Sequence, residues 1–339
     1  MNHPTPERDH SIDILRSLGL FCIILAHIEP PNWLFQLRNF DVPLMVFISG
    51  YLYSNKQYGI NSFKSLLDYL GKRFVRLVLP VWIFLSLFYG LQYLFPQLFS
   101  INYLQYPTVM LSSYLLLEGF GYVWIIRVFL MMAILGPLCV AYLRKPLQLL
   151  CYYLVYELLY QLASSYLKTP LGKLSNEFIG YAAGFLIFFI LGSQYQALSK
   201  RTKTWLLGIC LGISLSAWFY GYLYLDEAFN FGSFKYPPRL FYSYYALGVC
   251  LLLFQFKPLL AGWNSRLLNF VGSSSIWIYL WHILFLFILP ISDWMLRLVA
   301  VLSLAILMSY LQQRLIEAII LRSRCSARVS KQLRIIFCS

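Results

Sequence analysis

The first apolar segment of the chain carries three ionisable residues, Asp13, Arg16 and His27. Arg16 and His27 are eleven residues apart, so at about 100° per residue they lie on one face of a helix, with a rise of about 16 Å between them. Asp13 precedes Arg16 by three residues, a spacing at which a carboxylate can hold a guanidinium group. Such a face could bind an anion at one end and transfer a proton at the other. In the alternative interpretation, Asp13 and Arg16 only anchor the helix start and His27 is an interior histidine with a satisfied hydrogen bond.

A second basic group, Lys72, Arg73 and Arg76, precedes a later apolar run. Arg73 and Arg76 are three residues apart, so a helix presents their two planar guanidinium groups on one face, a geometry that suits phosphate oxygens. The alternative is ordinary anchoring by positive charges at a membrane edge. Because this group falls on the same predicted side of the membrane as Arg16, we expect the arginines to act together.

Two further segments carry candidate residues. His282 closes the sequence Tyr279-Leu280-Trp281-His282 inside an apolar run, where it is either a second acid or base or a hydrogen-bonding group that packs helices together. The segment Lys235-Tyr236-Pro237-Pro238-Arg239 contains two prolines, which stiffen a loop. This loop either forms a rim that shapes the access of an acceptor or simply ends one helix and starts the next.

The elements that position these residues are predicted to be membrane helices. The 339 residues are 60% hydrophobic and 12% charged, whereas soluble domains have roughly 45–50% apolar and about 25% charged residues. A soluble globular fold is therefore excluded, and the excess apolar surface must face lipid. At about 20 residues per span, the composition and length predict an all-α, polytopic membrane protein with about ten transmembrane helices.

Apolar runs bounded by charges, proline and glycine predict where these helices lie. The ten expected spans are 12–28, 40–53, 75–95, 122–143, 147–166, 178–195, 205–225, 240–256, 268–289 and 294–316. The second run is short and begins beside Asp41 and Pro43, so we expect it to be tilted, broken or lined by protein.

The distribution of basic residues predicts the orientation. Twenty of the 27 lysines and arginines fall on the side of the membrane that holds the N-terminus, so both termini are expected to be cytoplasmic. The net charge is +14, but the basic residues lie at the ends of apolar runs, so no nucleic-acid partner is expected. We predict a transmembrane domain over residues 1–320 and a basic cytoplasmic tail over 321–339 that binds membrane lipids. Seven cysteines form no CxxC pair, which indicates neither a disulfide framework nor a metal site.

With these residues in view, the chain resembles the acyltransferase-3 family of integral membrane O-acyltransferases, in particular members that acetylate bacterial surface polysaccharides. The matching pieces occur in family order and span most of the chain. They are Ile12-Asp13-Ile14-Leu15-Arg16 with His27 (an R-x10-H arrangement), Val42-Pro43-Leu44 with Ile48-Ser49-Gly50-Tyr51-Leu52, Arg73-Phe74-Val75-Arg76, Tyr236-Pro237-Pro238, and Ile278-Tyr279-Leu280-Trp281-His282.

The resemblance implies a ten-helix core, an acyl-CoA donor that is expected to be acetyl-CoA, and His27 as the catalytic residue. It implies that Arg16, Arg73 and Arg76 bind the donor or support the active site, and we assign Asp13 to the same group. His282, Ser49 and Tyr236 are secondary candidates. No tightly bound cofactor is expected, and the protein is expected in the bacterial inner membrane.

A physical mechanism follows from this assignment. The arginines would bind the phosphates of acyl-CoA near the cytoplasmic face, and the pantetheine arm would reach towards His27 over about 16 Å. His27 would act as general base on a hydroxyl group of a surface polysaccharide or lipid-linked saccharide, or would itself carry the acyl group, and the sequence leaves both routes open. The alternative function is a transporter or flippase for a small or lipid-linked solute, since transport also uses polar residues inside helices.

Overall fold

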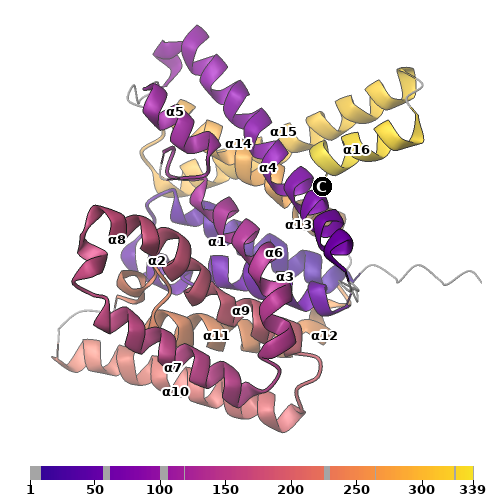
Figure 1. Cartoon of the computed structure of the whole chain (residues 1–339). Coiled ribbons are helices and arrows are strands. Elements are labelled where there is room, and N and C mark those ends of the chain that lie inside the picture. The colour runs from indigo at the N-terminus through magenta and orange to yellow at the C-terminus, as the bar shows by residue number, and fades with distance from the viewer. Residues whose placement is uncertain are drawn as a thin grey trace, which may run out of the picture.

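The chain folds as a bundle of helices (Figure 1). The computed structural model describes residues 9–55, 62–99, 106–117, 119–224, 230–263, 265–323 and 326–338. Within these residues helix accounts for 83% of the structure and there is no strand. The α-helices are α1 (His10–Ala26), α2 (Asn32–Leu37), α3 (Asp41–Asn55), α4 (Phe63–Leu94), α5 (Pro107–Tyr114), α6 (Trp124–Tyr142), α7 (Pro146–Leu162), α8 (Pro170–Ser175), α9 (Tyr181–Gln194), α10 (Lys200–Tyr224), α11 (Leu240–Gln255), α12 (Lys257–Leu260), α13 (Arg266–Ser273), α14 (Ser275–Ile288), α15 (Trp294–Arg322) and α16 (Ala327–Phe337).

Helix α1 lies at the centre of the bundle and is buried along most of its length. It contacts α3, α12, α13, α14 and α15, as expected for a helix that is apolar on nearly every face. Gly272 of α13 makes a close approach possible, because a Cβ atom there would overlap the backbone of Asp13. The Asp13 side chain is therefore held inside the protein, whereas the Arg16 side chain is 24% exposed.

Helices α3 and α9 pack backbone against backbone. A Cβ atom at Gly50 would overlap the carbonyl oxygen of Phe189, and one at Gly192 would overlap that of Phe47. Glycine is needed at both positions because no other side chain is small enough. The second predicted run, 40–53, is thus one continuous helix. We expected it to be tilted, broken or lined by protein, and the structure shows a helix lined by protein.

Helix α4 corrects the predicted third span. It begins at Phe63, about a dozen residues before the predicted start at 75, and Ser62 and Ser65 cap it reciprocally. Lys72, Arg73 and Arg76 consequently lie inside the helix and do not precede it. The prediction was wrong here because it followed hydropathy, whereas lysine and arginine are good helix formers and continue the backbone hydrogen bonds.

The ninth predicted span, 268–289, is also corrected. It divides into α13 and α14, which are bent by 83° at Ser274. The break falls in the sequence Gly272-Ser273-Ser274-Ser275, and glycine and serine are poor helix formers at which helices bend. Gln313 of α15 donates a hydrogen bond of 2.7 Å to the Ser274 hydroxyl and so stabilises the bend.

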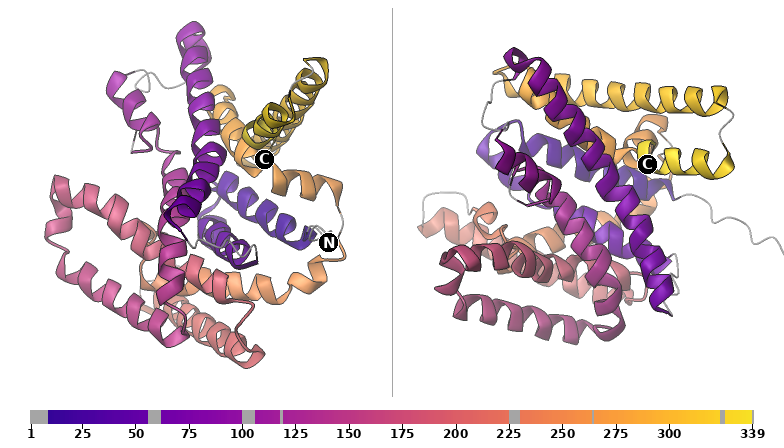
Figure 2. Two further views of the ribbon diagram at one scale, coloured as in Figure 1. Left: turned by 45° about the vertical axis from the view of Figure 1, so that its right-hand side comes forward. Right: turned by 45° about the horizontal axis from the view of Figure 1, so that its top comes forward.

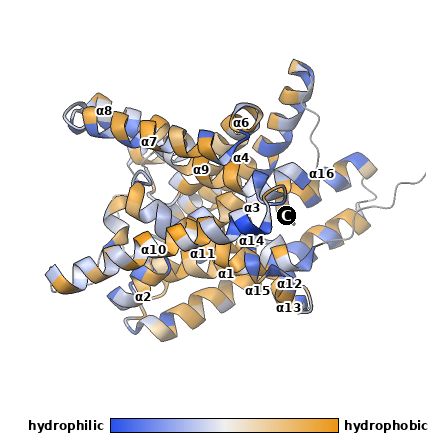
Figure 3. Ribbon diagram, turned by 90° about the horizontal axis from the view of Figure 1, so that it is seen from below, coloured by the Kyte–Doolittle hydropathy of each residue, from blue (hydrophilic) through white to orange (hydrophobic). Residues whose placement is uncertain are grey.

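Several helices suit a membrane. Among the described residues, five are long and apolar enough to cross one, and a sixth span results if α13 and α14 are counted together. In the apolar windows of α10 and α15 only 22% and 17% of residues are buried, so their apolar side chains are available to lipid (Figure 3). Each of the ten predicted runs contains a helix, but the count of ten spans and the side of the termini stay predictions.

The C-terminal helix α16 folds back beside α15 (Figure 2). The indole nitrogen of Trp277 donates a hydrogen bond of 2.7 Å to the carbonyl oxygen of Ile336, and the Trp277 and Phe337 rings stack at 5.7 Å. The predicted boundary at residue 320 falls in the last turn of α15. The described part of the tail is thus helical and docked on the bundle, while its binding to lipid stays a prediction.

Candidate functional site

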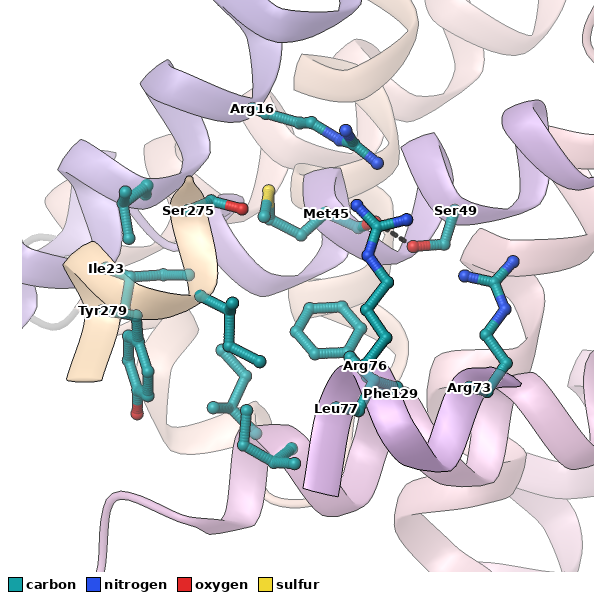
Figure 4. A pocket seen from close by; sticks show the side chains of 14 residues that line it. Arg16, Ile23, Met45, Ser49, Arg73, Arg76, Leu77, Phe129, Ser275 and Tyr279 are labelled. Atoms are coloured by element: carbon teal, nitrogen blue, oxygen red, sulfur yellow. Dashed lines mark hydrogen bonds between the residues drawn. The ribbon is translucent and has the colours of Figure 1, made fainter. Parts of the chain in front are cut away.

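Three arginines line one cavity of about 120 Å³, which we call the arginine cavity. Arg16 comes from α1, and Arg73 and Arg76 come from α4 (Figure 4). Figure 4 shows the Arg76 side chain extending from α4 towards Arg16, with Arg73 one turn away. Two helices that are distant in the sequence thus direct three positive charges into one space, an arrangement suited to a polyanionic ligand.

Contacts with neighbouring residues hold these arginines. Asp13 and Arg16 form an ion pair of 3.8 Å across three residues of α1, which confirms the predicted contact. The Arg73 guanidinium lies 5.1 Å from the centre of the Tyr69 ring. Lys72, the other basic residue of this group, is exposed and does not line the cavity. Of the three basic residues of α4, Arg73 and Arg76 thus face the cavity and Lys72 lies on the surface.

Ser49 also lines the arginine cavity. Its hydroxyl group donates a hydrogen bond of 2.9 Å to the backbone carbonyl of Met45 (Figure 4). The hydroxyl proton is therefore used within α3, and the oxygen remains able to accept a further bond.

A second cavity of about 190 Å³, which we call the histidine cavity, adjoins the first. It is lined by His27 at the end of α1 and by charged and aromatic residues from four other segments. Three residues, Ile23, Ile125 and Tyr279, line both cavities. The two spaces are thus neighbours along the face of α1 that carries Arg16 and His27, the two residues that helical spacing predicted to share a face.

The structure brings the two candidate histidines together. Nδ1 of His27 lies 3.1 Å from Nε2 of His282, and the rings are stacked with centroids 5.2 Å apart. His282 is fully buried in α14. The edge of the His27 ring packs against Tyr122 at 4.8 Å. His282 is therefore a direct neighbour of His27, and this contact is compatible both with a second acid or base and with a hydrogen-bonding group that packs helices together.

The hydrogen bonds determine the tautomers of the pair. Nδ1 of His282 is hydrogen-bonded to the carbonyl oxygen of Tyr279, and because a carbonyl only accepts, this nitrogen carries the proton. Nε2 of a neutral His282 then accepts a hydrogen bond from Nδ1 of His27. Nε2 of a neutral His27 is consequently unprotonated. His27 is thus oriented by a hydrogen-bonded partner, as general bases commonly are, and has a lone pair to accept a proton.

A buried charge group lies in the histidine cavity, and we define it as Arg38, Asp41 and Lys235. One oxygen of Asp41 is 2.6 Å from Arg38, and the other is 3.3 Å from the Lys235 ammonium. All three residues are at most 4% exposed. Charged groups at this depth must be paired, because an isolated one is strongly disfavoured.

Tyr236 forms part of the wall of the histidine cavity. It stacks on Tyr181 at 6.0 Å and meets the Trp124 ring edge to face at 5.2 Å, yet it is 51% exposed. Tyr236, Tyr181 and Trp124 thus form an aromatic cluster at the loop of residues 235–239, which we call the rim loop.

Helix α7 holds the rim loop in place through two contacts. Tyr156 donates a hydrogen bond of 3.1 Å to the carbonyl oxygen of Pro238, and Arg239 forms an ion pair of 2.8 Å with Glu157. Both contacts hold the loop against α7, and Lys235 and Tyr236 of the loop line the histidine cavity together with His27.

Sequence reasoning missed the buried charge group as part of the site. Arg38 and Asp41 are three residues apart, and this spacing was the available signal. Lys235 is 194 residues from Asp41, so local pattern could not pair them. Among the described residues no group of three or more His, Cys, Asp and Glu is arranged to hold a metal ion.

Comparison with known proteins identifies the family. No curated protein and no solved structure matches the chain at a significant level. The acyltransferase-3 family model, described as an acyltransferase domain, matches residues 9–311. This match covers nearly the whole chain and includes every candidate residue of both cavities. The chain therefore belongs to the acyltransferase-3 family, and it is a membrane acyltransferase.

Proposed function

We propose that this protein transfers an acyl group, in particular acetyl, from cytoplasmic acyl-CoA to a hydroxyl group of an extracytoplasmic glycan or lipid-linked saccharide. The observation that carries the proposal is the junction of the two cavities. Three arginines line one, the His27 base lines the other, and three side chains are common to both.

The arginine cavity suits the donor. CoA carries several phosphate groups, and arginine binds phosphate oxygens through paired, charge-assisted hydrogen bonds. Arg16 and His27 are separated along α1 by a rise of about 16 Å, a distance comparable to the reach of a pantetheine arm. A CoA molecule with its phosphates at the arginines would thus present its thioester near His27.

The histidine pair suits the chemistry. Nε2 of His27 would accept the proton of the acceptor hydroxyl while the oxygen attacks the thioester carbonyl, and the CoA thiolate would leave with a proton. In the covalent route His27 would carry the acyl group first, and a burst of CoA release without acceptor would distinguish that route. No tightly bound cofactor is required in either route.

The location completes the proposal. The excess of basic residues on one side supports a cytoplasmic location of both termini. The family favours a location in the bacterial inner membrane. The arginine cavity then lies towards the cytoplasm, where acyl-CoA is made, and the rim loop lies towards the outside. Membership of an acyltransferase family favours group transfer over the alternative of a transporter or flippase.

The test uses purified, detergent-solubilised protein with radiolabelled acetyl-CoA, with and without a crude glycan extract. Wild type should transfer label, and His27→Ala should not. His10→Ala, a histidine substitution at the other end of the same helix, serves as the matched control. If folded wild-type protein neither binds nor turns over acetyl-CoA, the proposal is wrong, and if His27→Ala keeps normal activity, the role of His27 is wrong.

A further inference from the structure

The buried charge group beside His27 contains two cations and one anion. Asp41 is fully engaged, since one oxygen accepts from Arg38 and the other accepts from Lys235 and, at 2.7 Å, from the backbone N–H of Val42. Asp41 is also the single carboxylate among the residues that line the histidine cavity. One positive charge therefore lacks a counter-charge in that cavity.

An uncompensated buried cation is costly, because burial removes its hydration without replacing it. The Lys235 ammonium has three N–H donors, and in the described part of the chain Asp41 is the one side chain that accepts from it. Lys235 as a whole is 97% buried. The ammonium also lies 6.0 Å from the centre of the Trp124 ring and 5.5 Å from that of the Tyr236 ring. Lys235 lines the histidine cavity, and an anion in that cavity would be strongly stabilised.

Arg38 also keeps a donor, because its buried Nε atom has no hydrogen-bond partner in the described part of the chain, but it is the more firmly held of the two cations. Its guanidinium forms the shorter bond to Asp41, at 2.6 Å, and lies 4.0 Å from the centre of the Phe35 ring. It is therefore held in place on two sides. Lys235, with a looser bond of 3.3 Å and a compact charge, has donors left for a transient partner.

Acyl transfer creates an anion next to the base. As the acceptor oxygen attacks the thioester, a C–O bond forms, His27 accepts the hydroxyl proton, and the carbonyl electron pair moves onto the carbonyl oxygen. When this intermediate collapses, the C=O bond re-forms, the C–S bond breaks, and the thiolate leaves with the proton from His27. The carbonyl oxygen carries a full negative charge only between these two steps, so donors placed there lower the barrier.

We propose that the Lys235 ammonium, held in place by Asp41, donates a hydrogen bond to this oxyanion. Lys235 is then a catalytic residue on the rim loop, and Asp41 and Arg38 are positioning residues. The inference rests on the proposed function, because the oxyanion forms only if the protein transfers acyl groups from a thioester.

The experiment compares Lys235→Met and Lys235→Arg with wild type, and Lys173→Met, an exposed lysine, is the matched control. Lys235→Met leaves Arg38 and Asp41 as a neutral pair, so the fold should be retained, which the thermal unfolding midpoint checks. Two rates are measured: acetyl transfer to glycan and the slower hydrolysis of acetyl-CoA by water. Hydrolysis is measured because water attacks the same thioester carbonyl and forms the same kind of oxyanion, but no glycan has to bind.

We expect Lys235→Met to lower kcat for both reactions by about 100-fold, the usual effect of losing one oxyanion donor. The KM for acetyl-CoA should change less than about twofold, because the arginine cavity is intact. Lys235→Arg should recover part of the activity, and Lys173→Met should behave as wild type. If Lys235→Met does not fold, Lys235→Gln is measured in its place.

Two results would overturn the inference. If the variant hydrolyses acetyl-CoA normally but has a raised KM for glycan, Lys235 binds an acidic acceptor and not the oxyanion. If both rates are normal, Lys235 has no catalytic role. Both results leave the proposed function intact, whereas wild-type protein that turns over no acetyl-CoA would disprove the proposed function itself.

Discussion

The contact between His27 and His282 leads to a prediction about a positioning residue. In the neutral pair, His282 has its proton on Nδ1, next to the Tyr279 carbonyl, and accepts a hydrogen bond of 3.1 Å from Nδ1 of His27, so that Nε2 of His27 is unprotonated. We expect His282→Leu to lower kcat, because the leucine side chain offers no acceptor. His27 would then either keep an unsatisfied N–H group or place its proton on Nε2, where it blocks the base.

The expected magnitude follows from the burial of the pair. His282 is fully buried, so water cannot replace the lost acceptor. A buried donor without a partner costs about 1–3 kcal/mol, and 1.36 kcal/mol in the barrier is tenfold in rate. The kcat of His282→Leu should therefore fall about 5-fold to 150-fold. His282→Gln, whose amide oxygen can lie near the position of Nε2, should keep more activity.

The assay measures initial rates of CoA release from acetyl-CoA in detergent micelles, with size-exclusion chromatography as the control for folding. The KM for acetyl-CoA should be unchanged, because His282 does not line the arginine cavity. A purely packing role would give equal losses for the leucine and glutamine variants, in proportion to their loss of stability. A folded His282→Leu protein with kcat within about twofold of wild type would refute the reasoning.

Three further predictions follow from the same contacts. Arg76→Ala should raise the KM for acetyl-CoA about tenfold to a hundredfold with little change in kcat, because it removes charged hydrogen bonds to the donor. An unchanged KM in steady-state kinetics would mean that Arg76 only anchors the helix at the membrane edge. Gly50→Ala should lower the thermal unfolding midpoint by forcing α3 and α9 apart at a cost of about 1–3 kcal/mol or more, whereas Gly208→Ala, with open space at its Cβ, should not. Asp41→Asn should destabilise the protein by about 3–5 kcal/mol, because it leaves two buried cations without a counter-charge; a midpoint that matches exposed Asp68→Asn would contradict this.

Local relations in the helical chain could be predicted from the sequence. The ion pair of Asp13 with Arg16 follows from helical spacing, and so does the shared face of Arg16 and His27, because 3.6 residues per turn determine which side chains are neighbours. The all-helical fold follows from composition, since lipid leaves a helix as the simplest way to satisfy backbone groups. Helix ends were predicted less well, as α4 shows, because capping serines and helix-forming lysines extend a helix beyond its apolar part.

Tertiary structure decided the relations between distant segments. His27 meets His282 across 255 residues, and Lys235 meets Asp41 across 194. Helical periodicity could not predict these contacts, because they depend on how α1, α3 and α14 pack and on the bend at Ser274. The sequence by itself determined a membrane acyltransferase-like chain with Arg16 and His27 on one helix face. Only packing supplied the partner that orients the histidine and the buried charges around it, because side-chain contacts across helices are set by close-packed shape and by the need to pair buried charge.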